Sequence, residues 1–342
     1  MLKRLKPINP ARFLATGFMG LIFCGSLLLM LPASQTAAEL SYVDALFTAA
    51  SAVCVTGLVV VDTGTFYTLF GQAVIMILIF CGSLGFMTMT TLIFVFLGRK
   101  ITLRDRLLVK EALNQEGIAG VVRLALTVVR IALLFIVAGM ILMSFRFVPL
   151  MGYERGLFFA LFHSVSAFGN AGFDLFGDFN SLTQMPVDYL VNSTIMVLFI
   201  LGGLGFTVIL ELIQHVRYRS RVTLHSHFVL IITAILLISG AFLILVLEYN
   251  NPETMGGLSG GAKIFTAFFT AATPRTAGFS VLNTGALSYP TMLILLALMF
   301  IGASPTSTGG GVKTTTFGIV FITFINMIRG RQVPVVFHVA YP

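Results

Sequence analysis

The stretch LFHSVSAFGNAGF, residues 161–173, places hydroxyls, an asparagine and two glycines between long apolar runs. Two other stretches align with it without gaps, LFTAASAVCVTGL over residues 46–58 and AFFTAATPRTAGF over residues 267–279. All three carry a glycine at the same place, and these glycines are 115 and 106 residues apart. The aligned glycines are Gly57, Gly172 and Gly278. Such regular spacing indicates an internal repeat.

The surrounding sequence is typical of an integral membrane protein. The chain has 342 residues, of which 10% are charged, against about 25% in a soluble domain, and its mean hydropathy is +1.00. Apolar stretches of the length that spans a bilayer, about 20 residues, recur along it. They are residues 13–32, 71–98, 124–145, 189–213, 228–249 and 289–303, the last continuing through a glycine-rich break to residue 328. These features exclude a soluble globular protein.

The net charge of +8 comes from basic residues that gather in alternate connections between the apolar stretches. This is the positive-inside pattern, which places the amino terminus and every second connection in the cytoplasm. The pattern also speaks against a nucleic-acid partner. The clusters are Lys3, Arg4, Lys6 and Arg12; Arg99, Lys100, Arg104, Arg106 and Lys110; Arg217, Arg219 and Arg221; and Arg329 and Arg331.

Each repeat reads as a spanning helix, a short amphipathic helix, a glycine turn and a second spanning helix. We expect repeat 1 over residues 1–110, repeat 2 over 111–222 and repeat 3 over 223–342. The short helix cannot cross the bilayer, so it is expected to be re-entrant. Non-helical backbone at membrane depth is tolerated only where protein or a water-filled cavity shields it. The three glycine turns should therefore line a cavity.

The turns have the chemistry of a cation pathway. A helix presents a negative partial charge at its carboxyl end, and a following glycine can adopt dihedrals that turn carbonyls inward. A ring of such carbonyls can replace the hydration shell of a potassium ion. No carboxylate is needed, and the three stretches contain none.

A second glycine-rich motif follows each turn: CGSLGF over residues 81–86, LGGLGF over 201–206 and IGASPTSTGGG over 301–311. In repeat 3 this motif is part of residues 302–313, which interrupt an apolar stretch. Three consecutive glycines do not hold a stable helix. A break of this kind survives at membrane depth only where it faces a shielded cavity.

Four motifs together resemble those of the Trk/Ktr/HKT superfamily, in particular the membrane subunits of bacterial Ktr/Trk potassium uptake systems (the KtrB/TrkH family). They are DALFTAASAVCVTGL (44–58), FHSVSAFGNAGF (162–173), TPRTAGF (273–279) and STGGGVKTTTF (307–317). The resemblance implies an all-α integral membrane fold, with four units of helix, pore helix, filter and helix around a pseudo-fourfold pore. Three units are found here, so we expect the fourth to be absent. The alternative is a non-conducting truncated remnant that associates with full-length subunits.

The resemblance also implies site residues. The filter would comprise Cys54, Val55, Thr56, Gly57 and Leu58; Gly169, Asn170, Ala171, Gly172 and Phe173; and Arg275, Thr276, Ala277, Gly278 and Phe279. Potassium would be held by the backbone carbonyls of Val55, Thr56, Asn170, Ala171, Thr276 and Ala277. The gating loop would comprise Gly302, Ser304, Pro305, Thr306, Ser307, Thr308, Gly309, Gly310, Gly311 and Lys313. In this family a glycine in the first filter goes with preference for potassium, and Gly57 meets that pattern.

Further expectations concern location and partners. The resemblance implies a multi-pass protein of the bacterial cytoplasmic membrane, in contact with lipid, that forms a dimer and docks a cytosolic nucleotide-binding regulatory ring. No cofactor is expected; potassium is the transported ion, and sodium is a candidate coupling ion. The chain is not expected to be an enzyme, because its histidines are scattered and no nucleophile or metal-ligand cluster is found.

Three polar residues within or beside the apolar stretches have separate expectations. Arg275 should position the third pore helix and its filter by hydrogen bonds, because a pore-facing arginine would repel cations. His163 should be a packed, hydrogen-bonded histidine rather than a catalytic one. Glu211 should form an ion pair at the cytoplasmic end of its helix.

Overall fold

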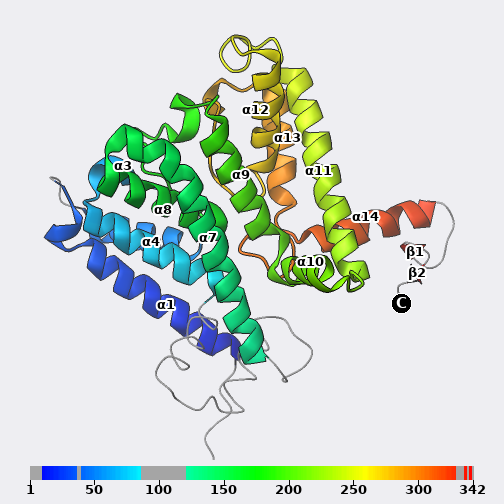
Figure 1. Ribbon diagram of the computed structural model, residues 1–342, viewed down its shortest axis with the longest axis horizontal. Coiled ribbons are helices and arrows are strands. Elements are labelled where there is room, and N and C mark those ends of the chain that lie inside the picture. The colour runs from blue at the N-terminus through cyan, green and yellow to red at the C-terminus, as the bar shows by residue number, and fades with distance from the viewer. Residues whose placement is uncertain (1–9, 37–39, 86–120, 329–334, 337–338, 341–342) are drawn as a thin grey trace, which may run out of the picture. The chain divides into compact units, whose positions relative to one another are not determined.

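The structure is a computed structural model that describes residues 10–36, 40–85, 121–328, 335–336 and 339–340. Within these residues the chain is mostly helical, with one pair of two-residue strands, β1 (Val335–Val336) and β2 (Val339–Ala340) (Figure 1). The predicted basic clusters at residues 3–6, 99–110 and 329–331 lie outside the described residues.

The chain forms two compact units. Unit 1 comprises Met1–Gln184 and Asp188–Phe199, and unit 2 comprises Met185–Val187 and Ile200–Pro342. The first two predicted filter stretches belong to unit 1 and the third belongs to unit 2. This division does not follow the three repeats, whose boundaries stay a prediction.

Hydroxyl and carboxylate N-caps begin several helices of unit 1. The side chains of Ser41, Asp62 and Thr68 accept hydrogen bonds from the backbone N–H groups of Asp44, Thr65 and Gly71, which satisfies donors that have no partner within the helix. The helices that lie wholly in unit 1 are α1 (Pro10–Leu29), α2 (Tyr42–Val53), α3 (Thr63–Phe66), α4 (Leu69–Leu84), α7 (Val121–Met151) and α8 (Tyr153–Gly169), with short 3₁₀ turns at Pro32–Ser34 and Ser181–Gln184. Helix α9 (Tyr189–Leu204) passes from unit 1 into unit 2.

In unit 2, Thr223 and Ser259 cap α11 and α12 in the same way. Helix α11 packs against α12, α13 and α14, and α10 packs against α11 (Figure 1). The helices are α10 (Phe206–Tyr218), α11 (Leu224–Glu248), α12 (Gly260–Ala272), α13 (Tyr289–Phe300) and α14 (Thr314–Ile328), with a 3₁₀ turn at Thr284–Ala286.

Two described helices are long and apolar enough to cross a membrane alone, Val122–Met151 and Leu224–Glu248. A third candidate span is the pair α9 and α10, if the two count as one bent helix. Helices α2 and α12 have 12 and 13 residues and rise about 18 and 20 Å, so neither reaches across a hydrocarbon core of about 30 Å. These two helices therefore have the length expected of re-entrant pore helices, whereas α8 has 17 residues and is longer than the short helix predicted for repeat 2.

The prediction of one continuous span over residues 189–213 is wrong. The chain bends by 103° between α9 and α10, at Gly205, whose φ is +95°. The bend is stable because the Phe206 N–H, which has no acceptor within its own helix, donates to the Thr306 carbonyl at 3.0 Å. In repeat 1, α4 likewise ends at a glycine of positive φ, Gly85; the remainder of the predicted 71–98 span lies outside the described residues.

Gly205→Ala is expected to destabilise the protein more than Gly85→Ala. Both substitutions force a side chain into the left-handed region, at a cost of about 1–3 kcal/mol. A Cβ at position 205 would also collide with the Pro305 carbonyl, whereas no described atom lies within 4 Å of a Cβ at position 85. The thermal midpoint in detergent measures the difference, with Gly20→Ala as a control that has neither strain nor contact. Equal midpoints for the two variants would contradict this account of the bend.

Candidate ion pathway

The three glycine turns have the same backbone. The residue two positions before each aligned glycine has a positive φ: 56° at Val55, 59° at Asn170 and 73° at Thr276. The glycines themselves have φ values of 79°, 72° and 81° at Gly57, Gly172 and Gly278. Left-handed conformations are costly for residues with a side chain and cluster at functional sites.

Each turn is also fastened to the end of the helix before it by a backbone hydrogen bond. The residue before the aligned glycine donates its N–H to the carbonyl five residues back in the first two turns, and to the carbonyl of the C-cap residue, four residues back, in the third. The pairs are Thr56 to Ser51 at 2.8 Å, Ala171 to Ser166 at 2.9 Å and Ala277 to Thr273 at 2.9 Å. The turns therefore begin at the carboxyl ends of α2, α8 and α12, where the helix dipole is negative.

Unit 1 brings the first two turns into contact. A Cβ at Gly57 would collide with the Ala171 carbonyl oxygen and lie 3.3 Å from the Cα of Gly172. Glycine is thus required at position 57 for two reasons, the positive φ and the close approach of the second turn. The predicted residues Cys54–Leu58 and Gly169–Phe173 form one site in unit 1, and Arg275–Phe279 lie in unit 2.

A side-chain hydroxyl fixes the far end of two of the turns. Ser166 Oγ donates to the Phe173 carbonyl at 2.6 Å, and Thr273 Oγ1 donates to the Phe279 carbonyl at 2.5 Å. Both phenylalanines are buried. Ser51 aligns with Ser166, but its buried Oγ has no hydrogen-bond partner among the described residues, and Leu58 is 59% exposed. The first turn therefore lacks the tether that the other two have.

His163 connects α8 to the segment that follows the second turn. Its Nδ1 lies 2.7 Å from the Phe159 carbonyl, and its Nε2 lies 3.2 Å from the Leu175 N–H. A carbonyl only accepts and an N–H only donates, so these contacts require a neutral ring with its proton on Nδ1. The ring is fully buried among Phe147, Phe159 and Phe176. The expectation of a packed, hydrogen-bonded histidine is confirmed.

Arg275 points toward α11. Its Nη2 donates to Thr233 Oγ1 at 3.4 Å, and the residue is 8% exposed. The guanidinium thus braces the third turn against a long apolar helix. This geometry supports the predicted positioning role.

Residues 302–313 form a closed loop between α13 and α14. The Ala303 N–H donates to the Gly310 carbonyl at 3.0 Å, and Lys313 Nζ donates to the Gly309 carbonyl at 2.8 Å. A Cβ at Gly302 would collide with the Gly310 carbonyl. The lysine is therefore an anchor within the loop.

The loop is bound to the break between α9 and α10. The Ser304 N–H donates to the Gly203 carbonyl at 3.0 Å, and the Thr308 N–H to the Gly202 carbonyl at 3.1 Å. The hydroxyls of Thr207 and Thr306 lie 3.0 Å apart. With the bond from Phe206 to Thr306, the contact joins two helix breaks that lie about a hundred residues apart in the sequence.

The loop also lies against the third turn, because a Cβ at Gly309 would collide with Thr276 Oγ1. Sequence reasoning did not find the partnership of the loop with residues 202–207. The GGLG motif of residues 202–205 is the sequence feature that marks one side of this contact.

The predicted ion pair of Glu211 is wrong within the described residues. Its carboxylate instead accepts hydrogen bonds from Ser226 Oγ at 2.7 Å and from the N–H and Oγ1 of Thr223. These groups lie at the start of α11, so Glu211 joins α10 to the N-terminus of the next helix. Among the described residues, the salt bridge that forms is between Arg146 and Asp188, at 2.6 Å.

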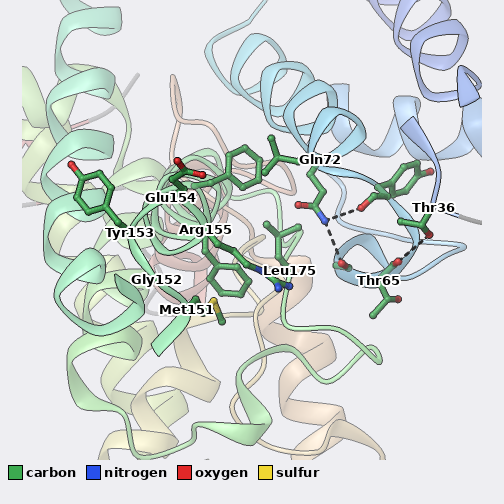
Figure 2. A pocket seen from close by; sticks show the side chains of 14 residues that line it. Thr36, Thr65, Gln72, Met151, Gly152, Tyr153, Glu154, Arg155 and Leu175 are labelled. Carbon is green, nitrogen blue, oxygen red and sulfur yellow. Dashed lines mark hydrogen bonds between the residues drawn. The ribbon is translucent and has the colours of Figure 1, made fainter. Parts of the chain in front are cut away.

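A separate cavity of about 880 Å³ opens in unit 1, between the start of α8 and residues 64–72. Figure 2 shows Tyr153, Glu154 and Arg155 on one side and Gln72, Thr65 and Thr36 on the other. Gln72 Nε2 is bound to the carbonyls of Thr63, Gly64 and Tyr67. None of the predicted filter or loop residues lines this cavity.

Comparison with known proteins identifies the class. The family model described as "TrkH: Cation transport protein" matches residues 14–339. The chain belongs to this family. It is a multi-pass membrane transport protein, and the prediction that it is not an enzyme is confirmed by the family.

The chain is also similar to individual proteins of known name. The chain is 45% identical to Ktr system potassium uptake protein B of Bacillus subtilis (strain 168), over 98% of this chain and 75% of that protein. It is 43% identical to the protein of the same name in Vibrio alginolyticus, over 95% of this chain and 71% of that protein. The crystal structure of the potassium transporter TrkH from Vibrio parahaemolyticus matches with a TM-score of 0.73 and 18% identity, covering 98% of this chain and 66% of that chain. That likeness confirms the fold, and the chain spans about two thirds of the solved protein.

Ser166→Ala and Thr273→Val are each expected to lower the thermal midpoint in detergent. Each removes a hydroxyl that holds a buried carbonyl, and a lost hydrogen bond of this kind costs about 0.5–1.5 kcal/mol. Ser51→Ala is the matched control and should be neutral or slightly stabilising, because its hydroxyl is buried without a described partner. A loss for Ser51→Ala as large as that for Ser166→Ala would contradict the difference between the turns.

Proposed function

We propose that this chain conducts potassium across the bacterial cytoplasmic membrane through the carbonyl-lined turns 54–58, 169–173 and 275–279. The observation that carries the proposal is the left-handed backbone repeated at the same two positions of all three turns. Backbone held in this way at the end of a short helix presents oxygens and no side-chain charge to a dehydrated cation. The relatives named as potassium uptake proteins support the choice of ion.

Selectivity follows from how closely the turns approach. The carbonyls of Val55, Thr56, Asn170 and Ala171 would hold the ion in unit 1, and those of Thr276 and Ala277 would hold it in unit 2. Their spacing depends on Gly57, which lets the second turn come near. One relative that is 40% identical is named a potassium/sodium uptake protein, so sodium is the competing ion to test, both as a permeating and as a coupling ion.

Residues 302–313 would act as the gate. The loop lies against Thr276 of the third turn. Its Lys313 ammonium group is held by a hydrogen bond to the Gly309 carbonyl. Opening would require release of the loop from residues 202–207, since three backbone bonds and one hydroxyl contact hold it there. Pro305 limits the backbone freedom of the loop, which favours its movement as one body.

The proposal includes partners that the family suggests. A dimer of membrane subunits and a cytosolic nucleotide-binding ring would place regulation on the inner side of the membrane. The exposed arginines after α10 lie on the side that the positive-inside rule assigns to the cytoplasm. Movement of α10 would act on the loop directly, because Phe206 begins the helix and binds Thr306.

Gly57→Ala is expected to reduce potassium preference over sodium on the order of tenfold, equivalent to about 1.4 kcal/mol. The added methyl would push the Ala171 carbonyl away from its position. Uptake of both ions by a bacterial strain deficient in potassium uptake provides the measurement. Gly20→Ala is the control, because a Cβ there has no neighbour within 4 Å. An unchanged ion ratio with normal expression of the variant would refute the assignment of the first turn.

Thr207→Val is expected to increase potassium flux by about two- to tenfold, since one lost hydrogen bond of about 0.5–1.5 kcal/mol shifts the loop toward release. Thr207→Ser keeps the hydroxyl and should behave as the unmodified protein. Flux into proteoliposomes that contain the full-length protein gives the comparison. If the valine variant conducts no faster than the serine variant, the contact does not hold the gate.

A further inference from the structure

Helix α10 is buried on one side only. Val208 packs with Leu204 and Val229 in a small hydrophobic core, and Leu212 lies against it. On the remainder of the helix, Ile213, Val216 and Tyr218 are 41%, 84% and 69% exposed. Ile213 and Val216, three positions apart, lie on the same side of the helix. Tyr218, two positions after Val216, points to another side and has the Arg217 guanidinium over its ring at 5.4 Å.

The bend fixes how α10 lies relative to the membrane. Helix α9 has 16 residues and rises about 24 Å, a little less than the hydrocarbon core of about 30 Å. The bend of 103° then turns α10 almost at right angles to α9. If α9 runs across the bilayer, α10 begins close to the boundary between acyl chains and headgroups and continues along the membrane plane.

The basic residues at the carboxyl end of α10 lie at the surface. Arg217 belongs to the last turn, Arg219 and Arg221 follow it, and all three are exposed. None of them forms a salt bridge with a carboxylate in the described part of the chain. The nearby carboxylate, Glu211, is already engaged by Thr223 and Ser226.

We propose that α10 and residues 219–221 form an interfacial arm that binds acidic phospholipids of the cytoplasmic leaflet. Ile213 and Val216 would enter the acyl boundary, as the apolar side of an amphipathic helix does. Arg217, Arg219 and Arg221 would bind the lipid phosphates, as basic clusters beside a membrane do. The inference rests on membership of a membrane family and on the bend, and it does not depend on which ion is carried.

The arm would matter for the loop as well as for anchoring. Its first residue, Phe206, donates to Thr306, and Thr207 contacts the same residue. Lipid that holds the arm in the membrane plane would therefore also fix the position of Phe206 and Thr207, which contact Thr306 of the loop.

The absence of tryptophan from the 342-residue sequence allows a direct test. Ile213→Trp or Val216→Trp introduces a reporter on the arm, and Ile235→Trp places one on α11, where Ile235 is 59% exposed. Each variant of the full-length protein is reconstituted in vesicles of equal phosphatidylcholine and phosphatidylglycerol. Bromine near the headgroup end of the acyl chains is placed on one lipid or on the other, and quenching of tryptophan fluorescence is measured.

We expect both arm reporters to be quenched, at least twofold more strongly by brominated phosphatidylglycerol than by brominated phosphatidylcholine. Replacing Arg217, Arg219 and Arg221 together by glutamine should remove that difference, while the reporter at position 235 should show no headgroup preference in either background. Absence of quenching at both arm positions, with quenching at 235, would overturn the proposal and leave the arm to water or to a regulatory protein. Equal quenching by the two lipids would overturn the acidic-lipid site. Potassium flux is not a readout, so failure here is distinct from failure of the proposed function.

Discussion

The structure depends on one constraint, that a backbone which leaves helical geometry at membrane depth must still pair its N–H and C=O groups. Two breaks in unit 2 meet the constraint by pairing with each other. Residues 302–313 donate to the carbonyls of Gly202 and Gly203, and Thr306 accepts from Phe206. Neither break has enough partners in its own helix, so each would be costly without the other. The hydrogen bonds that satisfy the backbone groups at the two breaks also join the candidate gate to α10.

The glycine turns meet the constraint differently. Each turn donates back to the helix before it, and in two turns a serine or threonine of that helix also holds the next carbonyl. Under the proposed function, the remaining carbonyls would face an ion, and no acidic side chain would be needed. The positive φ values at Val55, Asn170 and Thr276 show that residues with a side chain adopt a strained backbone conformation in these turns.

The sequence was sufficient for features that recur locally. Alignment on three glycines predicted a helix before each turn, the turns and the break after Ile301, because backbone conformation there follows from residue type. The length of α8, 17 residues, was not predicted. It failed where distant groups decide the outcome. Residues 189–213 are apolar enough for one helix, and the bend at Gly205 exists because Thr306 accepts the Phe206 N–H. Glu211 was assigned an ion pair from nearby arginines, but the hydroxyls and N–H at the start of α11 offered a better-aligned set of donors.

The first turn differs from its two counterparts although its sequence aligns without gaps. Ser51 occupies the place of Ser166, yet the tether to the following carbonyl is missing and Leu58 lies open where Phe173 is buried. In the third turn the aligned position is Ala272, and the tether comes from Thr273, one residue later. The first turn is held by the backbone hydrogen bond from Thr56 to Ser51 of its own helix and by the close approach of Ala171 and Gly172 to Gly57. The spacing of the first two turns in unit 1 therefore depends on the absence of a side chain at position 57.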